Sequence, residues 1–246
     1  RQCENDGAEA LSINPVVGEC NDSRINRISL RAIGAGQVKK AFDAAGEDTE
    51  EGDVGAGAGT ICYGLKGGIG SASRVIRIGE KEYTIGVLVQ SNFGATEDFV
   101  LNGESVGAKI LDWKQEKDDM AASEEDKGSI MSILATDLPL TSRQLRRILR
   151  RTGVGIARTG GYTGHGSGEV MIGFTTANRI PSGAEEELLQ IQAIPEHVIN
   201  RAFLAAAEAE QEAILNSMTA AERTRGQAGE LYYSLSEYLE DQDSKQ

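Results

Sequence analysis

Cysteine and histidine are scarce in this sequence. It has three cysteines, at positions 3, 20 and 62, and two histidines, His165 and His197. The cysteines are odd in number and scattered, and they form no Cys-x-x-Cys pair. Only two histidines could serve with them as metal ligands. The pattern therefore argues against a disulfide framework and against a structural zinc site.

An excess of basic residues and long apolar runs are also lacking. The formal net charge is -13 at pH 7 and the pI is about 4.7, a balance that repels phosphate backbones and anionic membrane surfaces. Apolar runs such as residues 85–89 are far shorter than the ~20 residues that cross a bilayer. The sequence predicts a soluble protein, cytoplasmic in the simplest interpretation, that binds neither nucleic acid nor membrane.

The amino-terminal end carries no targeting signal that can be recognised. Residues 1–10 have neither the basic start nor the apolar core of a signal peptide. We expect Arg1 to be an internal start, so export cannot be judged from this end.

What the sequence has in abundance is glycine, concentrated in EGDVGAGAGTICYGLKGGIGSASR at residues 51–74. Such density indicates tight turns or close approach of other groups. Strand-like runs follow at 73–78 and 83–90, with a hairpin turn at 79–82 between them. A third strand is predicted at 130–135. A charged surface loop is predicted for 114–127, a glycine-rich and then strand-like stretch for 153–180, and a long helix for 195–218. With 246 residues and 39% hydrophobic content, we expect one domain, 1–246, of the mixed α/β layered class.

A second helix is predicted from capping chemistry. Thr141 and Gln144 form a capping box, which places a helix start near Ser142. This helix carries five arginines, and a nucleic-acid surface is one interpretation of them. Since the whole chain is acidic, a solvated helix face that pairs with acidic neighbours is the favoured one.

Two further motifs have competing interpretations. The run GAGAGT could cradle a phosphate, but no Gly-Lys-Ser/Thr follows it and TICYGLKGG is a poor helix start, so phosphate binding is disfavoured. His165 and His197 could each act as a base, but neither has a nucleophile nearby in a motif such as Gly-x-Ser-x-Gly. A surface or hydrogen-bonded histidine is the favoured interpretation of both.

The step Gly128-Ser129 lies between the charged stretch and a predicted buried strand. A serine there commonly only begins a strand. If the bond between the two residues is cut, however, Ser129 gains an α-amine that can take the proton from its own hydroxyl. The pKa of such an amine is about 7.7 to 8.0, so a useful fraction is unprotonated near neutral pH, and no histidine is required.

Whole segments decide between these interpretations. VVGECNDSRIN (16–26), the glycine-rich stretch 51–74, YTIGVLVQSNFG (83–94), GSIMSILATDLPLTSRQLRRILRRTGVGIARTG (128–160) and GSGEVMIGFTTANR (166–179) occur in this order. Together they resemble the DmpA/BapA family of L-aminopeptidase/D-esterases and β-peptidyl aminopeptidases. The likeness runs from about Pro15 to Gly229, and members of that family extend further before the position of Arg1.

The resemblance implies a precursor that cuts itself between Gly128 and Ser129 into an α chain (1–128) and a β chain (129–246), and an αββα sandwich like that of amino-terminal-nucleophile hydrolases. It implies Ser129 as nucleophile, Asn92 and Tyr63 at the oxyanion, and Ser167 and Glu169 hydrogen-bonded around the nucleophile. Glu51 would hold the free ammonium of a substrate. The implied substrates are small peptides, amides or esters with a free amine, with no cofactor or metal, and the implied assembly is a homo-oligomer of αβ protomers, a tetramer.

Two other functions remain open from the residues alone. One is a self-cleaving acyltransferase of the ornithine acetyltransferase type, which shares a related architecture but usually has threonine as its nucleophile. The other is a non-enzymatic glycine-rich binding protein, for which an uncut chain and an occupied anion site at 55–60 would be the signature.

Overall fold

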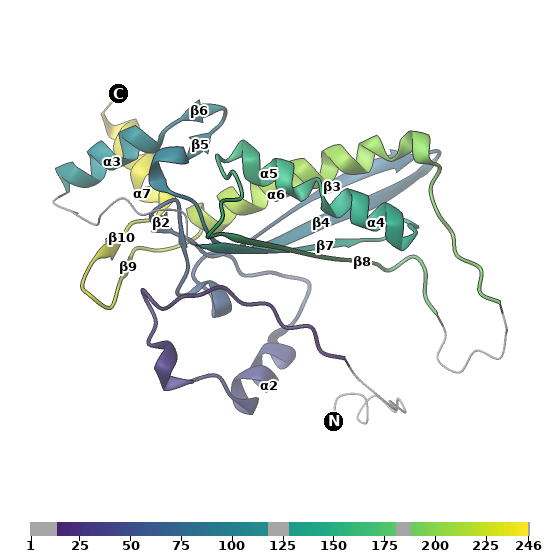
Figure 1. Cartoon of the computed structure of the whole chain (residues 1–246), viewed down its shortest axis with the longest axis horizontal. Coiled ribbons are helices and arrows are strands. Elements are labelled where there is room, and N and C mark those ends of the chain that lie inside the picture. The colour runs from purple at the N-terminus through teal and green to yellow at the C-terminus, as the bar shows by residue number, and fades with distance from the viewer. Residues whose placement is uncertain (1–13, 118–127, 181–187, 246) are drawn as a thin grey trace.

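A four-stranded sheet forms the centre of the molecule (Figure 1). The computed structural model describes residues 14–117, 128–180 and 188–245. The strand order is β3 (Ile69–Ile78), β4 (Lys81–Asn92), β7 (Ser129–Thr136) and β8 (Gly168–Thr175). The pairs β3/β4 and β4/β7 are antiparallel, whereas β7/β8 is parallel. The two inner strands, β4 and β7, therefore have a partner on either side.

The hairpin and the third strand confirm the sequence predictions and extend them. The strands predicted at 73–78 and 83–90 are β3 and β4, joined by a turn at Gly79 and Glu80, where Gly79 has φ +63. This left-handed conformation favours glycine because it carries no Cβ. The strand predicted at 130–135 is β7, and it begins at Ser129 itself.

Three helices cover one face of the sheet (Figure 1). They are α4 (Ser142–Leu149), α5 (Thr152–Arg158) and α6 (Asn200–Thr219). The predicted capping box is present, because Thr141 Oγ1 accepts from the Gln144 backbone N–H and the Gln144 side chain accepts from the Thr141 N–H. The alanine-rich face of α6 lets the helix lie directly on β3: a Cβ on Gly70 would be 2.0 Å from the Ala213 carbonyl oxygen.

Two stretches are helical in part where the sequence analysis expected no helix: the loop predicted at 114–127 and the glycine-rich start of 153–180. Residues 114–116 belong to α3 (Gly107–Glu116), on which Trp113 and Lys114 are buried; the rest of the loop predicted at 114–127, from residue 118 on, lies outside the described residues. The start of the stretch 153–180 is helix α5, where close packing on α6 requires Gly155, since a Cβ there would be 2.6 Å from the Ala207 carbonyl oxygen. Tertiary packing overrides the low local helix preference in both places.

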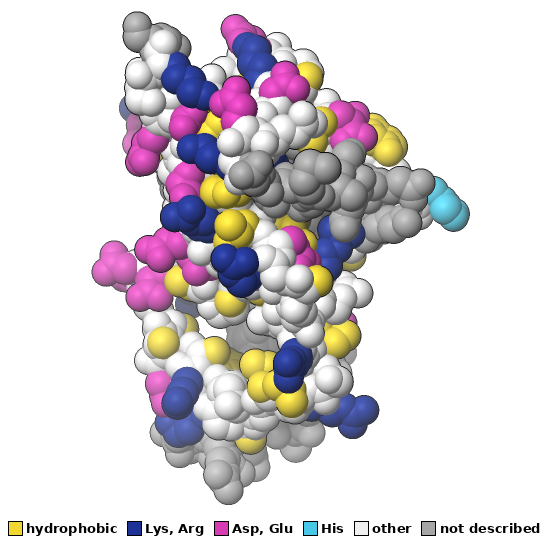
Figure 2. Space-filling view, turned by 90° about the vertical axis from the view of Figure 1, so that its left-hand side faces the viewer, with side chains coloured by type: hydrophobic (Ala, Val, Ile, Leu, Met, Phe, Trp, Pro, Cys, Tyr) yellow, Lys and Arg dark blue, Asp and Glu magenta, His cyan; other side chains and the backbone are white. Residues whose placement is uncertain are grey.

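Smaller elements lie outside the main sheet and its three covering helices. They are α2 (Ala35–Ala44), β1 (Ile61–Cys62), β2 (Leu65–Lys66), β5 (Val100–Leu101), β6 (Glu104–Ser105), β9 (Thr224–Arg225), β10 (Leu231–Tyr232) and α7 (Leu235–Ser244). Helices α3 and α7 are joined by the exposed ion pairs Lys117–Asp241 and Lys245–Glu116. In Figure 2, basic and acidic side chains are interspersed among the described residues. Among the described residues, no helix has the length and apolarity that a membrane span requires.

The face of the sheet opposite α6 is largely open in the described parts of the chain. Its apolar side chains include Val75, Ile133, Val170 and Phe174, which are between 36% and 62% exposed. Helix α2 lies on this side of the sheet (Figure 1) and buries none of its residues. The apolar core is thus built on the α4–α6 side.

Among the described residues, one carboxyl group lies in that core. Glu210 on α6 is 0% exposed, its Oε1 accepts a 2.5 Å hydrogen bond from the Ser132 hydroxyl on β7, and its Oε2 has no hydrogen-bond partner among the described residues. Burial raises the pKa of Glu210 from 4.5 to about 7, and the Ser132 hydrogen bond opposes this only in part. The native state therefore favours the neutral carboxyl.

The raised pKa predicts a measurable dependence of stability on pH. Below pH 4.5 the carboxyl is protonated in both states; between pH 4.5 and 7 the unfolded chain ionises while the folded chain resists. This group therefore lowers the free energy of unfolding by ~3 kcal/mol as the pH rises through that range. Urea unfolding of Glu210→Gln and of wild type at several pH values gives the free energy of unfolding of each. The difference between these two free energies should change by this amount between pH 4.5 and 7. A difference that stays constant with pH would contradict the raised pKa.

Candidate active site

Ser129 lies at the amino-terminal end of the inner strand β7, where three strands meet. It pairs with Asn92, the last residue of β4, and with Gly168, the first residue of β8. The side chain is half-buried. Since residues paired across neighbouring strands point to the same face, the Asn92 side chain and Ser129 Oγ share the face opposite α6.

The peptide bond before Ser129 is held tightly. The Gly128 carbonyl oxygen accepts a 3.1 Å hydrogen bond from the Gly168 N–H. A Cβ on Gly128 would lie 1.9 Å from the Asn92 carbonyl oxygen, and one on Gly168 would lie 3.1 Å from Ser129 Oγ. Glycine is thus required at 128 because the main chain of β4 fills the space that a side chain would need.

The Asn92 amide is fixed from two sides. Its Oδ1 accepts a 3.0 Å hydrogen bond from the Ile61 N–H, and its Nδ2 donates a 3.2 Å hydrogen bond to the Asn21 carbonyl oxygen. The Ile61 N–H can only donate, which determines which end of the amide is oxygen. Nδ2 carries a second N–H, so the amide has one donor to offer to a developing negative charge.

Ser167 and Glu169 are brought together on the other side of Ser129. The Ser167 hydroxyl donates a 2.7 Å hydrogen bond to Glu169 Oε1, and both side chains are half-buried. Glu169 follows Gly168 on β8, so it points to the face opposite that of Ser129 Oγ. This arrangement suits contact with the main-chain nitrogen of Ser129 better than contact with its hydroxyl.

Tyr63 lies behind the end of β4. Its side chain is 0% exposed, its ring packs on Phe93 and Phe99 with centroid distances of 5.1 and 4.6 Å, and its hydroxyl is 2.9 Å from Thr159 Oγ1. The Tyr63 N–H donates to the Phe93 carbonyl oxygen at 2.9 Å. The residue therefore supports the strand end that carries Asn92, and its role at the oxyanion stays a prediction.

Glu51 is anchored on the outer strand β3. Its Oε1 accepts hydrogen bonds from the Ser71 N–H at 2.6 Å and from the Ser71 hydroxyl at 2.7 Å. The next residue, Gly52, forms a bridge with Ile69 at the start of β3. Ser71 and Ser129 point to the same face of the sheet, but the register places Ser71 level with Ile133, four residues along β7 from Ser129, so the role of Glu51 in binding substrate stays a prediction.

Lys66 is a buried cation that the sequence analysis did not single out. It is 0% exposed, and its Nζ donates hydrogen bonds of 2.8 Å to the carbonyl oxygens of Gly57 and Gly67. Burial lowers the pKa of Lys66 from 10.5 to about 8, and Asp53 acts in the opposite direction. The ammonium group ties the glycine-rich loop to β2, and a lysine flanked by glycines in GLKGG was the signal for it.

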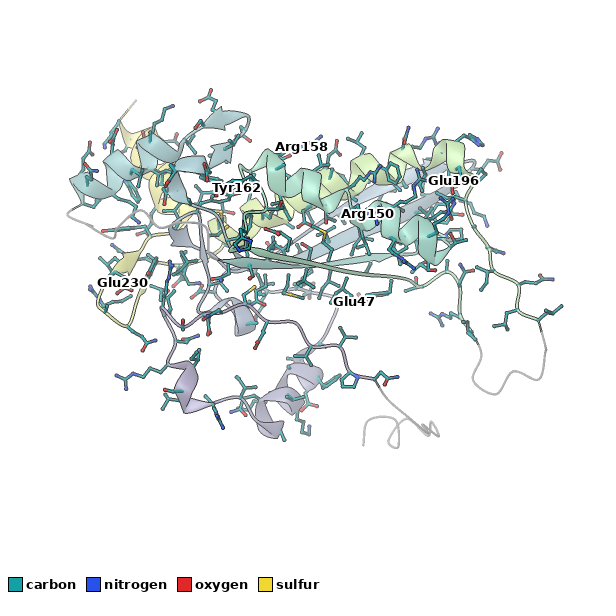
Figure 3. The ribbon with its side chains drawn as sticks, viewed as in Figure 1. Glu47, Arg150, Arg158, Tyr162, Glu196 and Glu230 are labelled. Atoms are coloured by element: carbon teal, nitrogen blue, oxygen red, sulfur yellow. The ribbon has the colours of Figure 1, made fainter. Side chains whose placement is uncertain are left out.

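The arginine-rich helix α4 lies away from Ser129. Glu196 contacts Arg143 and Arg147 of α4 at the end of the sheet far from the start of β7, whereas Tyr162 lies near that start (Figure 3). The arginine-rich helix therefore pairs with an acidic neighbour, as the favoured interpretation holds. Both histidines are exposed.

Comparison with known proteins places this arrangement in a family. The description "Peptidase family S58" matches residues 1–232. The chain belongs to peptidase family S58. The resemblance to the DmpA/BapA family is thereby confirmed, since two similar proteins are β-peptidyl aminopeptidases BapA. The present chain is 37% identical to the BapA of Sphingosinicella xenopeptidilytica over 220 residues, and 35% identical to the BapA of Sphingosinicella microcystinivorans over 224 residues.

These alignments cover 86% and 87% of the S58 chain but 55% and 57% of the two relatives. The chain thus spans little more than half the length of the relatives that it matches.

Solved structures confirm the fold class. The PH0078 protein of Pyrococcus horikoshii OT3 has a TM-score of 0.85 and 44% identity, over 97% of the S58 chain and 65% of its own. An L-aminopeptidase D-Ala-esterase/amidase of Ochrobactrum anthropi has a TM-score of 0.79 and 35% identity, over 89% and 60%, and is described as a variant of the Ntn hydrolase fold. The S58 chain thus has the predicted α/β fold of amino-terminal-nucleophile hydrolases. In an αββα sandwich, a second sheet packs on the face that is open here.

Proposed function

We propose that this protein is a self-processing aminopeptidase whose nucleophile is Ser129, freed by a cut between Gly128 and Ser129. The observation that carries the proposal is the surroundings of Ser129: the Asn92 amide lies opposite it on β4, and the hydrogen-bonded pair Ser167–Glu169 lies beside it where β8 begins. The names of the relatives, β-peptidyl aminopeptidase and serine aminopeptidase, support the same activity.

The first reaction is the cut itself. Ser129 Oγ attacks the Gly128 carbonyl carbon, its proton passes to the Ser129 nitrogen, and the C–N bond breaks, so that the acyl group moves from the nitrogen to the oxygen as an ester. Water then hydrolyses the ester, which releases the Gly128 carboxylate and leaves Ser129 with a free amine. During the attack, negative charge develops on the Gly128 oxygen, to which the Gly168 N–H already donates a hydrogen bond.

The second reaction uses the new amine. The neutral α-amine takes the proton from Ser129 Oγ, which attacks the first carbonyl carbon of a substrate. Asn92 Nδ2 donates to the oxyanion, the amine or alcohol leaves with the proton, and water hydrolyses the acyl-enzyme. The Ser167–Glu169 pair would orient the α-amine and stabilise its protonated form.

The substrates we propose are small peptides, amides or esters with a free amine. Glu51 would bind the substrate ammonium through Oε2, because both contacts to Ser71 use Oε1. Tyr63 is a further proposed oxyanion residue. We expect residues 1–246 to act as one catalytic domain, cut into 1–128 and 129–246, and the associated αβ protomers to form a homo-oligomer, a tetramer as the resemblance implies.

Two measurements on the purified protein test this function. Intact mass should give one fragment that ends at Gly128 and one that begins at Ser129. Amino-acid p-nitroanilides and β-peptides with a free amine should be hydrolysed, whereas the same compounds N-acetylated should not, because Glu51 would then have no ammonium to bind.

Three outcomes would contradict the proposal. A protein that stays uncut and still removes amino-terminal residues would need another nucleophile. Acyl transfer to an added amine at the expense of hydrolysis would indicate an acyltransferase, and a protein that stays uncut and inactive would indicate a binding function.

A further inference from the structure

A short segment far from Ser129 in sequence lies across the end of β4 and β7. We propose that this segment, Cys20–Asp22, is a strap that positions both the nucleophile Ser129 and the oxyanion donor Asn92, with Cys20 as its positioning residue. The inference rests on the proposed function of these two residues.

Cys20 contacts the two inner strands at once. Its Sγ lies 3.4 Å from the Ser129 carbonyl oxygen and 3.7 Å from the Gln90 carbonyl oxygen, and its single S–H is shared between these two acceptors, the nearer being Ser129. These distances are within the reach of a thiol donor, which is weak but directional. Cys20 is 8% exposed, and burial raises the pKa of its thiol from 9.0 to about 11. The sulfur therefore keeps its proton at neutral pH and remains a donor.

Asn21 holds the other partner. Its carbonyl oxygen accepts from Asn92 Nδ2 at 3.2 Å, while the Ile61 N–H binds Asn92 Oδ1. The two contacts act on opposite ends of one amide group, so they fix its rotation and leave the second N–H of Nδ2 in a single direction. Adjacent residues of the strap thus hold the attacking residue and the donor that would stabilise the product of attack.

The strap is itself anchored at its far end. The Asp22 carbonyl oxygen accepts from the backbone N–H groups of Ile25 and Asn26 at 3.1 and 2.9 Å, and Asn26 Nδ2 donates to Asp22 Oδ2 at 2.5 Å. Gln227, next to β9, donates through Nε2 to the Ser23 and Asn26 carbonyl oxygens at 2.5 and 2.6 Å.

The glycine-rich loop packs underneath the strap. A Cβ on Gly59 would lie 2.4 Å from Asn26 Nδ2 and 2.7 Å from the Asp22 Cβ. These contacts and the anchors at Gln227 give the strap a defined position from which it can restrain other groups.

The restraint matters most after the cut. In the uncut chain Ser129 is held by a peptide bond on each side, but the cut removes the bond on its amino side. After the cut, only the peptide bond on its carbonyl side still holds Ser129. The Cys20 thiol binds that carbonyl group and so restrains the free amine and Oγ. A shift of about 1 Å at a reacting group can cost ~100-fold in rate, so loss of this contact should lower turnover.

The matched variants Cys20→Thr and Cys20→Val test the strap. They have nearly the same shape, and only threonine keeps a hydrogen-bond donor. We expect Cys20→Thr to keep kcat within about 3-fold of wild type and Cys20→Val to lose about 10- to 100-fold in kcat, with KM changed by less than about 3-fold. Self-cleavage of freshly made Cys20→Val should be slower by a similar factor. Both variants are compared below their thermal unfolding transitions.

The outcomes separate the strap from the proposed function. Wild-type hydrolysis together with unchanged kcat and cutting in Cys20→Val would overturn the strap alone. Equal losses in both variants would also overturn it, because a purely steric role is shared by the two shapes. A wild-type protein that cuts itself but hydrolyses no free-amine substrate would overturn the aminopeptidase, and the cutting rates of the two variants would still decide the strap.

Discussion

Ser129→Ala is expected to yield a single uncut chain without hydrolase activity. The variant lacks the oxygen that attacks the Gly128 carbonyl, and without the cut no α-amine forms to act as base. Both reactions fail at once, so the expected effect is complete loss rather than a reduced rate. Denaturing electrophoresis and intact mass report the cut, and hydrolysis of an amino-acid p-nitroanilide reports the activity.

Two further variants make this result specific. Ser73, which is exposed on β3, serves as the matched control, and Ser73→Ala should cut itself and hydrolyse substrate as wild type does. Ser129→Thr keeps a hydroxyl and should still cut, more slowly because its methyl group crowds the site next to Gly168. Two bands from Ser129→Ala would show that another group or another protein makes the cut.

Asn92→Ala should lower kcat by about 100-fold, the effect of removing one oxyanion donor from a comparable site. An oxyanion donor binds the transition state more strongly than the ground-state carbonyl, so KM should change little. The substitution also leaves the Ile61 N–H without its acceptor, which costs about 1 to 3 kcal/mol of stability if that group stays buried. Kinetics should therefore be measured well below the thermal unfolding transition.

The control for this stability cost is Asn178→Ala. Asn178 binds the carbonyl oxygens of Leu140 and Gln192, away from Ser129, so its loss should lower stability without lowering kcat. Asn92→Asp keeps an acceptor for Ile61 but has no donor, and should lose at least as much turnover as Asn92→Ala. If Asn92→Asp restored turnover, the acceptor and not the donor would be the functional group.

Local signals in the sequence predicted much of the fold. The capping box at Thr141 and Gln144, the hairpin turn at 79–82 and the strand at 130–135 each depend on neighbours within a few residues, and each is present. Helix α3 was missed, because its burial depends on distant contacts such as the packing of Trp113 on Tyr233 and Tyr238. A charged stretch with one tryptophan gives no local sign of that packing.

In the candidate site, too, local sequence indicates some contacts and not others. A spacing of two residues puts the side chains of Ser167 and Glu169 on one face of a strand, and the structure adds the hydrogen bond between them. The pairing of Asn92 with Ser129 came from family resemblance, not from any local pattern. The contact of Cys20 with Ser129 spans 109 residues, and no property of Cys20 in the sequence indicates it.

The tight fit of Gly128 against the end of β4 limits how an external molecule can imitate the precursor. Because the Asn92 carbonyl oxygen occupies the space of a Cβ at that position, an amino acid with an L side chain has no room to bind along the path that the protein's own backbone takes. Any such guest must reach Ser129 in a different pose. Selectivity for the internal bond and selectivity for outside molecules should therefore be separable by protein engineering.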